Sequence, residues 1–179
     1  MENRSTAEST AKKFTIEDAP GGDNSVVLMN PRDLEELNLF KGDVVVLKAG
    51  SYETVAIVIT EDMAISSVRI NKTIRNNLRA NIKDNLEMSP LTDIQYSKRV
   101  HILPFEDTIK KELEKDLFND YLKPYFQDAY RPVKDGDTFL YNGVEFKILT
   151  VEPGPYGIIA PETIIHCEGE PLQRKTDSQ

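Results

Sequence analysis

Hydrophobic residues in the first hundred positions occur in short, mostly β-branched runs. The runs are "SVVLM", "DVVVLKAG", "TVAIVIT", "SVRIN", "LEMSPL" and "RVHILP". Each is short and bounded by Gly, Pro, Asp or Asn, which is typical of β-strands. Two other stretches, "PRDLEELNLF" and "KTIRNNLRANI", carry leucine or isoleucine at helical spacing, so we expect a short helix in each.

The same order of strand, short helix, turn ending in Asp, and strand occurs twice. A shift of 41 residues superimposes five pairs of similar residues: Asn30/Asn71, Leu37/Leu78, Asp43/Asp84, Val45/Leu86 and Leu47/Met88. A unit found twice favours a pseudo-two-fold fold over a solenoid, which needs three or more copies. Because closing a sheet removes its edges, two such units predict a closed six-stranded barrel.

The pattern changes near residue 104. In "PFEDTIKKELEKDLFNDYLKPYF", Ile109, Leu113, Leu117 and Tyr121 recur every four residues, which predicts an amphipathic helix with Thr108 as N-cap. Pro124 is expected to end or bend it. Further on, Asn142-Gly143 between two alternating runs predicts a tight hairpin. The second half therefore reads as a smaller β-rich unit.

These patterns divide the chain into four segments. We expect a polar, disordered arm at residues 1–13, a barrel at 14–103, a smaller unit with a leading helix at 104–170, and a linker at 171–179. The linker is expected to lead toward a further part of the protein that this sequence lacks.

Composition and charge narrow the possible partners. The chain has 179 residues and a formal net charge of −8. This charge repels phosphate backbones, which disfavours nucleic acid and favours partners that offer Arg or Lys. The single Cys167 excludes an intramolecular disulfide and indicates a reducing compartment. With no targeting signal or membrane-length apolar run, we expect a cytoplasmic or nuclear protein.

The sequence contains no convincing catalytic or metal-binding motif. His101 and His166 lie in strand-like runs without a second ligand at suitable spacing, and His166 and Cys167 are predicted to point to opposite faces. A Cys167–His101 catalytic pair stays open, although nothing near Cys167 predicts a lowered thiol pKa. There is no glycine-rich phosphate loop. We therefore expect no enzymatic activity, no metal and no cofactor in this chain.

Basic residues gather on the second short helix. They are Lys72, Arg75, Arg79 and Lys83, at spacings of three and four. In an acidic chain this cluster is either a solvated helix face or a charged contact to another domain.

Several motifs, in order along the chain, resemble one known family. "DNSVV", "ELNLFKGDVV", "RNNLR", "YLKPYF", "AYRP", "KDGD" and "IIHCEGEP" are similar to the N-terminal domain of valosin-containing protein, a hexameric AAA+ ATPase that extracts ubiquitylated proteins. The resemblance spans nearly the whole expected folded region. The chain departs from the family in its short "YNGVEF" hairpin, in Asn81 where many members have Arg, and in "KKELEKD". These departures concern local contacts to the ATPase ring.

The resemblance implies a mainly β fold: a double-psi β-barrel followed by a small four-stranded β-barrel. It implies a platform for adaptor proteins, with ATP and Mg²⁺ bound only in the parent's other modules. Ubiquitin-like UBX domains and Arg-rich helices would bind between the two subdomains. The matching positions are Asp23, Val26, Phe40, Lys41, Gly42, Asp43, Ile57, Ile59, Tyr96, Ala129 and Tyr130.

The resemblance also divides the aromatic residues of the second half and implies two further sites. Tyr130 would face the adaptor, whereas Leu117, Tyr121 and Tyr125 would pack inward. Phe118 and Tyr156 match positions near an edge where family members bind a linear motif by strand addition. Lys72, Arg75, Arg79 and Lys83 would contact the ATPase ring. The isolated domain is expected to be a monomer and the parent protein a hexamer.

Two rival interpretations remain. In the first, the chain is the N-domain of the related vesicle-fusion AAA+ ATPase and binds trafficking adaptors. Alternatively it would be an enzyme, since double-psi barrels also host decarboxylases and proteases. "DGDT" at 135–138 is not the turn that an aspartic protease requires.

Overall fold

The computed structural model describes residues 11–109 and 116–174 and divides the chain into two compact units. The first unit ends at Ile94 and the second begins at Gln95. This division lies before the boundary expected at residues 103–104. The strand "RVHILP" belongs to the second unit because it pairs with two other strands there.

The first unit is the closed six-stranded barrel that the repeat predicted. Around the barrel the order is β1-β5-β2-β4-β3-β6. Its elements are β1 (Lys12–Asp18), β2 (Val26–Met29), α2 (Pro31–Glu36), β3 (Val44–Ala49), β4 (Tyr52–Thr60), β5 (Ser67–Ile70), α3 (Lys72–Leu78) and β6 (Asn85–Pro90). The arm expected at residues 1–13 is therefore wrong for Lys12 and Lys13, which pair with Met88 and Glu87. Residues 1–10 lie outside the described part.

The 41-residue repeat is visible in the strand pairing. Adding 41 to the bounds of β2 and β3 reproduces those of β5 and β6. The parallel pair β2–β4 has its counterpart in the parallel pair β5–β1, while β2–β5 and β3–β6 are antiparallel. The two copies thus interleave, because β2 and β3 of the first copy pair with β5 and β6 of the second.

Matching residues of the repeat perform matching tasks. Asn30 and Asn71 are the N-caps of α2 and α3, where their side chains accept hydrogen bonds from Arg32 N and Ile74 N. The Asp43 carboxylate accepts from Phe40 N and the Asp84 carboxylate from Asn81 N, both at 2.8 Å. The same side-chain chemistry therefore starts each helix and holds each turn.

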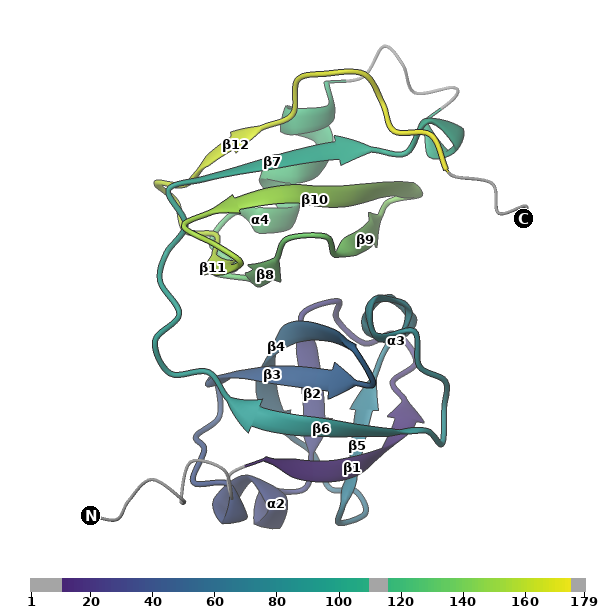
Figure 1. The fold of residues 1–179 in the computed structure, drawn as a ribbon, viewed down its shortest axis with the longest axis vertical. Coiled ribbons are helices and arrows are strands. Elements are labelled where there is room, and N and C mark those ends of the chain that lie inside the picture. The colour runs from purple at the N-terminus through teal and green to yellow at the C-terminus, as the bar shows by residue number, and fades with distance from the viewer. Residues whose placement is uncertain (1–10, 110–115, 175–179) are drawn as a thin grey trace. The chain divides into compact units, whose positions relative to one another are not determined.

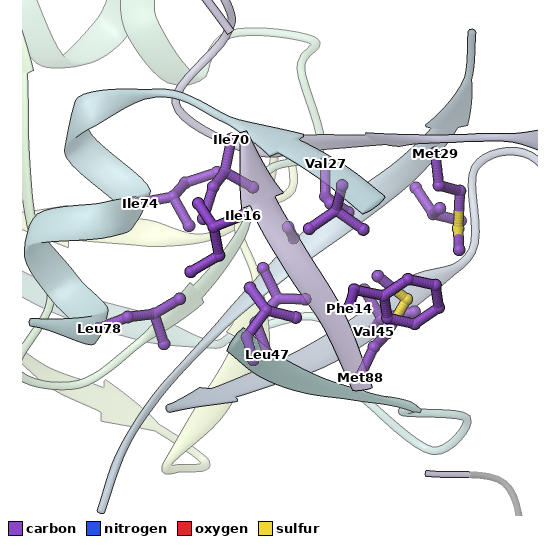
Figure 2. Packing of buried hydrophobic residues seen from close by; sticks show 14 of the residues in the cluster. Phe14, Ile16, Val27, Met29, Val45, Leu47, Ile70, Ile74, Leu78 and Met88 are labelled. Carbon is purple, nitrogen blue, oxygen red and sulfur yellow. The ribbon is translucent and has the colours of Figure 1, made fainter. Parts of the chain in front are cut away.

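The six strands close around one interior (Figure 1), which their alternating inward residues fill. Figure 2 shows Ile74 and Leu78 of α3 pointing toward Ile16, Ile70 and Leu47 of the strands. Leu34 of α2 also belongs to this core. The short helices are therefore held mainly by apolar burial, since a helix of this length is marginal alone.

The second unit is built on a four-stranded sheet in the order β12-β7-β10-β9, with a two-stranded sheet β11-β8. This fits the small barrel expected there. Its elements are β7 (Arg99–Pro104), the 3₁₀ turn η1 (Glu106–Thr108), the π-helical turn η3 (Phe118–Leu122), α4 (Lys123–Phe126), β8 (Pro132–Lys134), β9 (Thr138–Tyr141), β10 (Val144–Glu152), β11 (Tyr156–Ile158) and β12 (Ile164–His166). None of the helices within residues 11–109 and 116–174 is long and apolar enough to cross a membrane.

The Asn142-Gly143 hairpin forms as expected. Both residues have positive φ, 49° and 83°, and Tyr141 pairs with Val144 across the turn. Two positive φ values in succession are the mark of the type I′ turn that matches the twist of paired strands.

The long helix expected from Thr108 differs from the structure. Thr108 is the last residue of η1, where its hydroxyl donates to the carbonyl of Phe105 at 2.8 Å and accepts from Glu145 N at 3.1 Å. The residues that it was expected to cap, 110 and 111, lie outside the described part. Leu113 lies outside the described residues. The chain is helical again from Phe118, and α4 continues to Phe126, beyond Pro124. Pro124 lies at the start of α4, directly after the π-helical turn η3, and does not end the helical stretch.

An aromatic stack forms the core of the second unit. Tyr125 lies 4.5 Å from Phe139 with nearly parallel rings, and Phe139 stacks on Phe146 at 5.3 Å. Tyr121 is buried beside them, and Leu117 packs against the same cluster. The expectation that Leu117, Tyr121 and Tyr125 pack inward is therefore confirmed.

The end of the described chain is docked on the second unit. Arg174 donates to Asp107 at 2.7 Å and to Glu145 at 2.6 Å, and its guanidinium lies 4.2 Å from the Phe105 ring centroid. Leu172 forms a β-bridge with Phe105. The linker expected at 171–179 is therefore wrong for residues 171–174, because ion pairs and a backbone bridge hold them.

We expect Asn71→Ala to lower the free energy of unfolding by about 1–2 kcal/mol. Besides capping α3, the Asn71 side chain donates to Gly22 O and Asn24 Oδ1. Asn76→Ala is the control, since Asn76 is exposed in the middle of the same helix. Urea unfolding should show a loss only for Asn71→Ala; equal midpoints would contradict the capping role.

We also expect Asp116 to contribute to stability at neutral pH and to lose that contribution in acid. Hydrogen bonds from the backbone N–H of Asn119, its side chain and the Phe118 N–H lower the pKa of the Asp116 carboxyl. A depressed folded-state pKa means that the contribution is complete above the ordinary value of 3.8 and disappears as pH falls through the lower, folded-state value.

Asp116→Asn should therefore lower the melting temperature at neutral pH and make its fall in acid shallower, measured by circular dichroism between about pH 6 and pH 2.5. Asp93→Asn, an exposed loop residue, is the control and should keep the original slope. An unchanged slope for Asp116→Asn would sink the assignment.

Candidate functional site

Eight of the expected adaptor-binding residues lie on the first unit, and all of them gather around one stretch of β4. Val26 of β2 and Val44 of β3 are register partners of Ile57 on its two sides. Since Val27, Val45 and Val58 point into the core, alternation turns Val26, Ile57 and Ile59 to the outer face. They are half-buried, so this outer face is apolar without being part of the core.

The turn that carries Phe40 is tied to the same stretch. Gly42 N donates to Val58 O at 2.8 Å, and Val58 N donates to Asp43 O at 2.9 Å. Gly42 has a φ of +97°, a backbone conformation that residues other than glycine rarely adopt. The turn leaves the Phe40 side chain 76% exposed, the largest fraction among the large hydrophobic residues of the described chain.

The two acidic candidates of the first unit have local tasks. Asp23 is exposed, and its Oδ1 accepts from Ser25 N at 2.7 Å, while Ile57 N donates to Ser25 O. The Asp43 Oδ2 accepts from Phe40 N. Both carboxylates therefore shape the turns beside β4 and also add negative charge there. Lys41, in the same turn as Asp43, is exposed.

The second unit supplies a pair of exposed tyrosines. The rings of Tyr96 and Tyr130 lie 5.8 Å apart at 44°, and the residues are 57% and 42% exposed. Tyr96 is held by a bridge to Ile158, with Ser97 N donating to Ile158 O. Tyr130 has a positive φ of 51° and follows the half-buried Ala129. The expected division of the aromatic residues is visible here: Tyr125 is buried and Tyr130 is not.

Arg131 positions the Tyr130 loop, a role that the sequence reasoning missed. Its Nε donates to the carbonyl of Tyr125 at 2.9 Å, and its guanidinium lies 3.9 Å from the centroid of the Tyr125 ring. This cation–π contact ties the loop to the aromatic core. The "AYRP" motif contained the residue, but only the fold shows which ring it covers.

The two residues expected at a linear-motif site sit in different local settings. Phe118 is half-buried and packs against the second core, whereas Tyr156 begins β11 opposite Lys134. The side of β11 away from β8 is bridged at Ile158 by Tyr96. The strand-addition site at Phe118 and Tyr156 stays a prediction.

The basic residues do not form one helix face. α3 ends at Leu78, Arg79 is its left-handed C-cap and Lys83 lies beyond it. Arg75 pairs with Asp18 at 2.7 Å, Lys83 pairs with Glu17 at 2.8 Å, and Arg79 lies over the Tyr52 ring. The helical spacing failed because a positive φ at Arg79 turns the chain away. Lys72 is exposed at the start of α3.

The candidate Cys167–His101 pair is not supported. Burial raises the pKa of the Cys167 thiol, with the negative charges of Asp116 and Glu168 adding to the effect. The neutral thiol is therefore favoured, which is the reverse of what a nucleophilic cysteine requires. Within residues 11–109 and 116–174, no three His, Cys, Asp or Glu side chains gather in a way that would hold a metal ion.

Comparison with protein-family models gives two matches that follow the chain in order. Residues 13–94 match the model of the cell division protein 48 (CDC48) N-terminal domain. Residues 112–174 match the model of CDC48 domain 2. The first match ends where the first structural unit ends. The double-psi barrel and the small barrel of this family account for the two units.

One matched model describes the N-terminal domain of CDC48, a domain that binds protein cofactors, and the other describes its domain 2; neither describes an ATPase module. Together the two matches cover most of the chain. Each unit they cover exposes aromatic residues on its surface, Phe40 on the first and Tyr96 and Tyr130 on the second. The chain therefore belongs to the CDC48 family of AAA+ ATPases and comprises its N-terminal domain and domain 2.

Proposed function

We propose that this chain binds protein adaptors of UBX type and Arg-rich helical motifs through two surfaces. The first surface consists of Asp23, Val26, Phe40, Lys41, Gly42, Asp43, Ile57 and Ile59. The second consists of Tyr96, Ala129 and Tyr130. The observation that carries the proposal is the exposure of Phe40, Tyr96 and Tyr130 while the other aromatic rings near Tyr130 in sequence are buried.

The chemistry of the two surfaces suits protein partners. Phe40 lies beside the outward apolar residues of β2 and β4, which cost little to desolvate. The tyrosine rings add large contact area, and their hydroxyls can form hydrogen bonds at the edge of an interface. Asp23 and Asp43 place negative charge next to this apolar surface. That arrangement favours arginines on a partner, as does the net charge of −8.

Two further contacts belong to the same proposal. A linear motif would bind the second unit near Phe118 and Tyr156 by strand addition. The ATPase ring of the parent hexamer would contact the basic region. Within that region Lys72 and Arg79 are the better candidates, because Arg75 and Lys83 already pair with acidic residues of their own unit.

The proposed cellular role follows from adaptor binding. The parent protein would extract ubiquitylated proteins, including those of endoplasmic-reticulum-associated degradation, in the cytoplasm and nucleus. A vesicle-fusion type of N-domain, which binds trafficking adaptors, is the alternative. The matched family models favour the first of these.

We expect Phe40→Ala and Tyr130→Ala each to weaken the binding of a UBX domain by about 1–4 kcal/mol. Both side chains are exposed, so the variants should unfold at nearly the same urea concentration as the unchanged chain. Isothermal titration calorimetry with a purified UBX domain measures the effect.

Tyr52→Ala is the matched control, since Tyr52 is an aromatic residue of the first unit that is 45% exposed and lies outside the proposed surfaces. Its affinity should not change. Full affinity in both Phe40→Ala and Tyr130→Ala would refute the proposal, and binding of a trafficking adaptor in place of the UBX domain would favour the alternative.

A further inference from the structure

Two histidines that are far apart in the sequence are neighbours in the second unit. β7 and β12 pair in parallel, and His101 and His166 are register partners. Neighbouring strands lie about 4.8 Å apart, and register partners direct their side chains to the same face of the sheet. His101 and His166 therefore occupy neighbouring positions on one face of the sheet.

The face on which they stand is the outer one. Val100 and Ile102 of β7 belong to the core, and Ile165 of β12 packs against it. Because side chains alternate along a strand, His101 and His166 point away from that core. His166 is exposed and His101 half-buried. Cys167 packs against the core, so the expectation that it diverges from His166 holds.

The hydrogen bonding of His101 suits a metal ligand. Its Nε2 lies 3.1 Å from the backbone carbonyl oxygen of Glu168. A carbonyl only accepts, so Nε2 carries the hydrogen, and Nδ1 of the neutral ring keeps its lone pair. Histidines that bind metals commonly donate their other N–H to a carbonyl or carboxylate in this way.

The charged residues on this face are of both signs, since Arg99, Glu152 and Lys147 of β10 lie on it. Arg99 lies two residues before His101 and so on the same face of β7, and its guanidinium lies 3.6 Å from the Glu152 carboxylate. Thr150 is the register partner of His101 on β10, brought there by a bulge between Ile148 and Thr150. The exposed Glu168 adds a negative charge in the loop that follows β12.

We propose that His101 and His166 form a two-imidazole site for a borderline divalent transition ion such as Zn²⁺ or Ni²⁺. Zinc–nitrogen bonds of about 2.0–2.1 Å place two ligand nitrogens roughly 3.3 Å apart. Two side chains on adjacent strands reach this separation by rotation about their χ angles. Imidazole ligands select such ions over Mg²⁺ and Ca²⁺, which prefer oxygen.

The site is an open one. Since the residues that the structure describes offer no third His, Cys, Asp or Glu in a metal-holding group, the remaining coordination positions belong to water or to a side chain of a bound protein. Its affinity is accordingly lower than that of a four-ligand structural zinc site. The bound ion would link β7 to β12, the strand that leads into the "HCEGEP" motif.

Isothermal titration calorimetry of the untagged full chain with Zn²⁺ and Ni²⁺, in a buffer that does not coordinate metals, tests this site. We expect one ion per chain and no binding of Mg²⁺. His166→Asn and His101→Asn should each weaken binding about tenfold or more, because losing a ligand costs more than losing a second-shell partner.

Cys167→Ser and Thr150→Val are the matched controls and should bind the ions as the unchanged chain does. His166 is exposed, so its variant should stay folded even where that of the half-buried His101 does not. Undiminished affinity in His166→Asn, or no heat of binding with either transition ion, would overturn the proposal.

Discussion

Closure of the six-stranded barrel is the constraint on which the first unit depends. Each copy of the repeat is too small to bury its own apolar face, and each leaves strand edges unpaired. Interleaving solves both problems, since β2 of one copy pairs with β4 and β5, and β3 pairs with β4 and β6. The barrel then has no open edge for unwanted strand addition.

Closure also determines what the outer surface can present. Once every second residue of a strand is committed to the core, its neighbours must face outward whatever their polarity. Along β4 these neighbours are Ile57 and Ile59, and the turn that reaches Val58 brings Phe40 beside them. An apolar outer patch on a protein of net charge −8 is costly in isolation and useful for binding a partner.

The second unit separates its aromatic residues by a comparable rule. Tyr125 stacks on Phe139, which stacks on Phe146, so its ring is part of the core. The Arg131 guanidinium covers the Tyr125 ring. Tyr130 lies between Tyr125 and Arg131 in sequence and has a positive φ, and its exposed ring lies next to that of Tyr96. One face of this unit thus offers paired tyrosines, and the outer face of its sheet offers paired histidines.

The sequence by itself determined the β-rich class, the two-copy barrel, the hairpin at Asn142-Gly143 and the family. These signals are local or repeat at a constant spacing, so a single chain displays them. Its errors occurred where a left-handed backbone residue or a long-range contact overrode a local pattern. Arg79 ended a helix that the basic spacing extended to Lys83, and strand pairing moved "RVHILP" into the second unit. Arg174 docked a tail that looked like a linker.

Only the tertiary structure decided which side chains become neighbours across the chain. It joined the turn that carries Phe40 to β4, and His101 to His166. The physical reason is that strand register is set by burial of one face, and register then places the residues of the other face in rows. No spacing in the sequence encodes those rows, because the paired strands are separated by long and unequal lengths of chain.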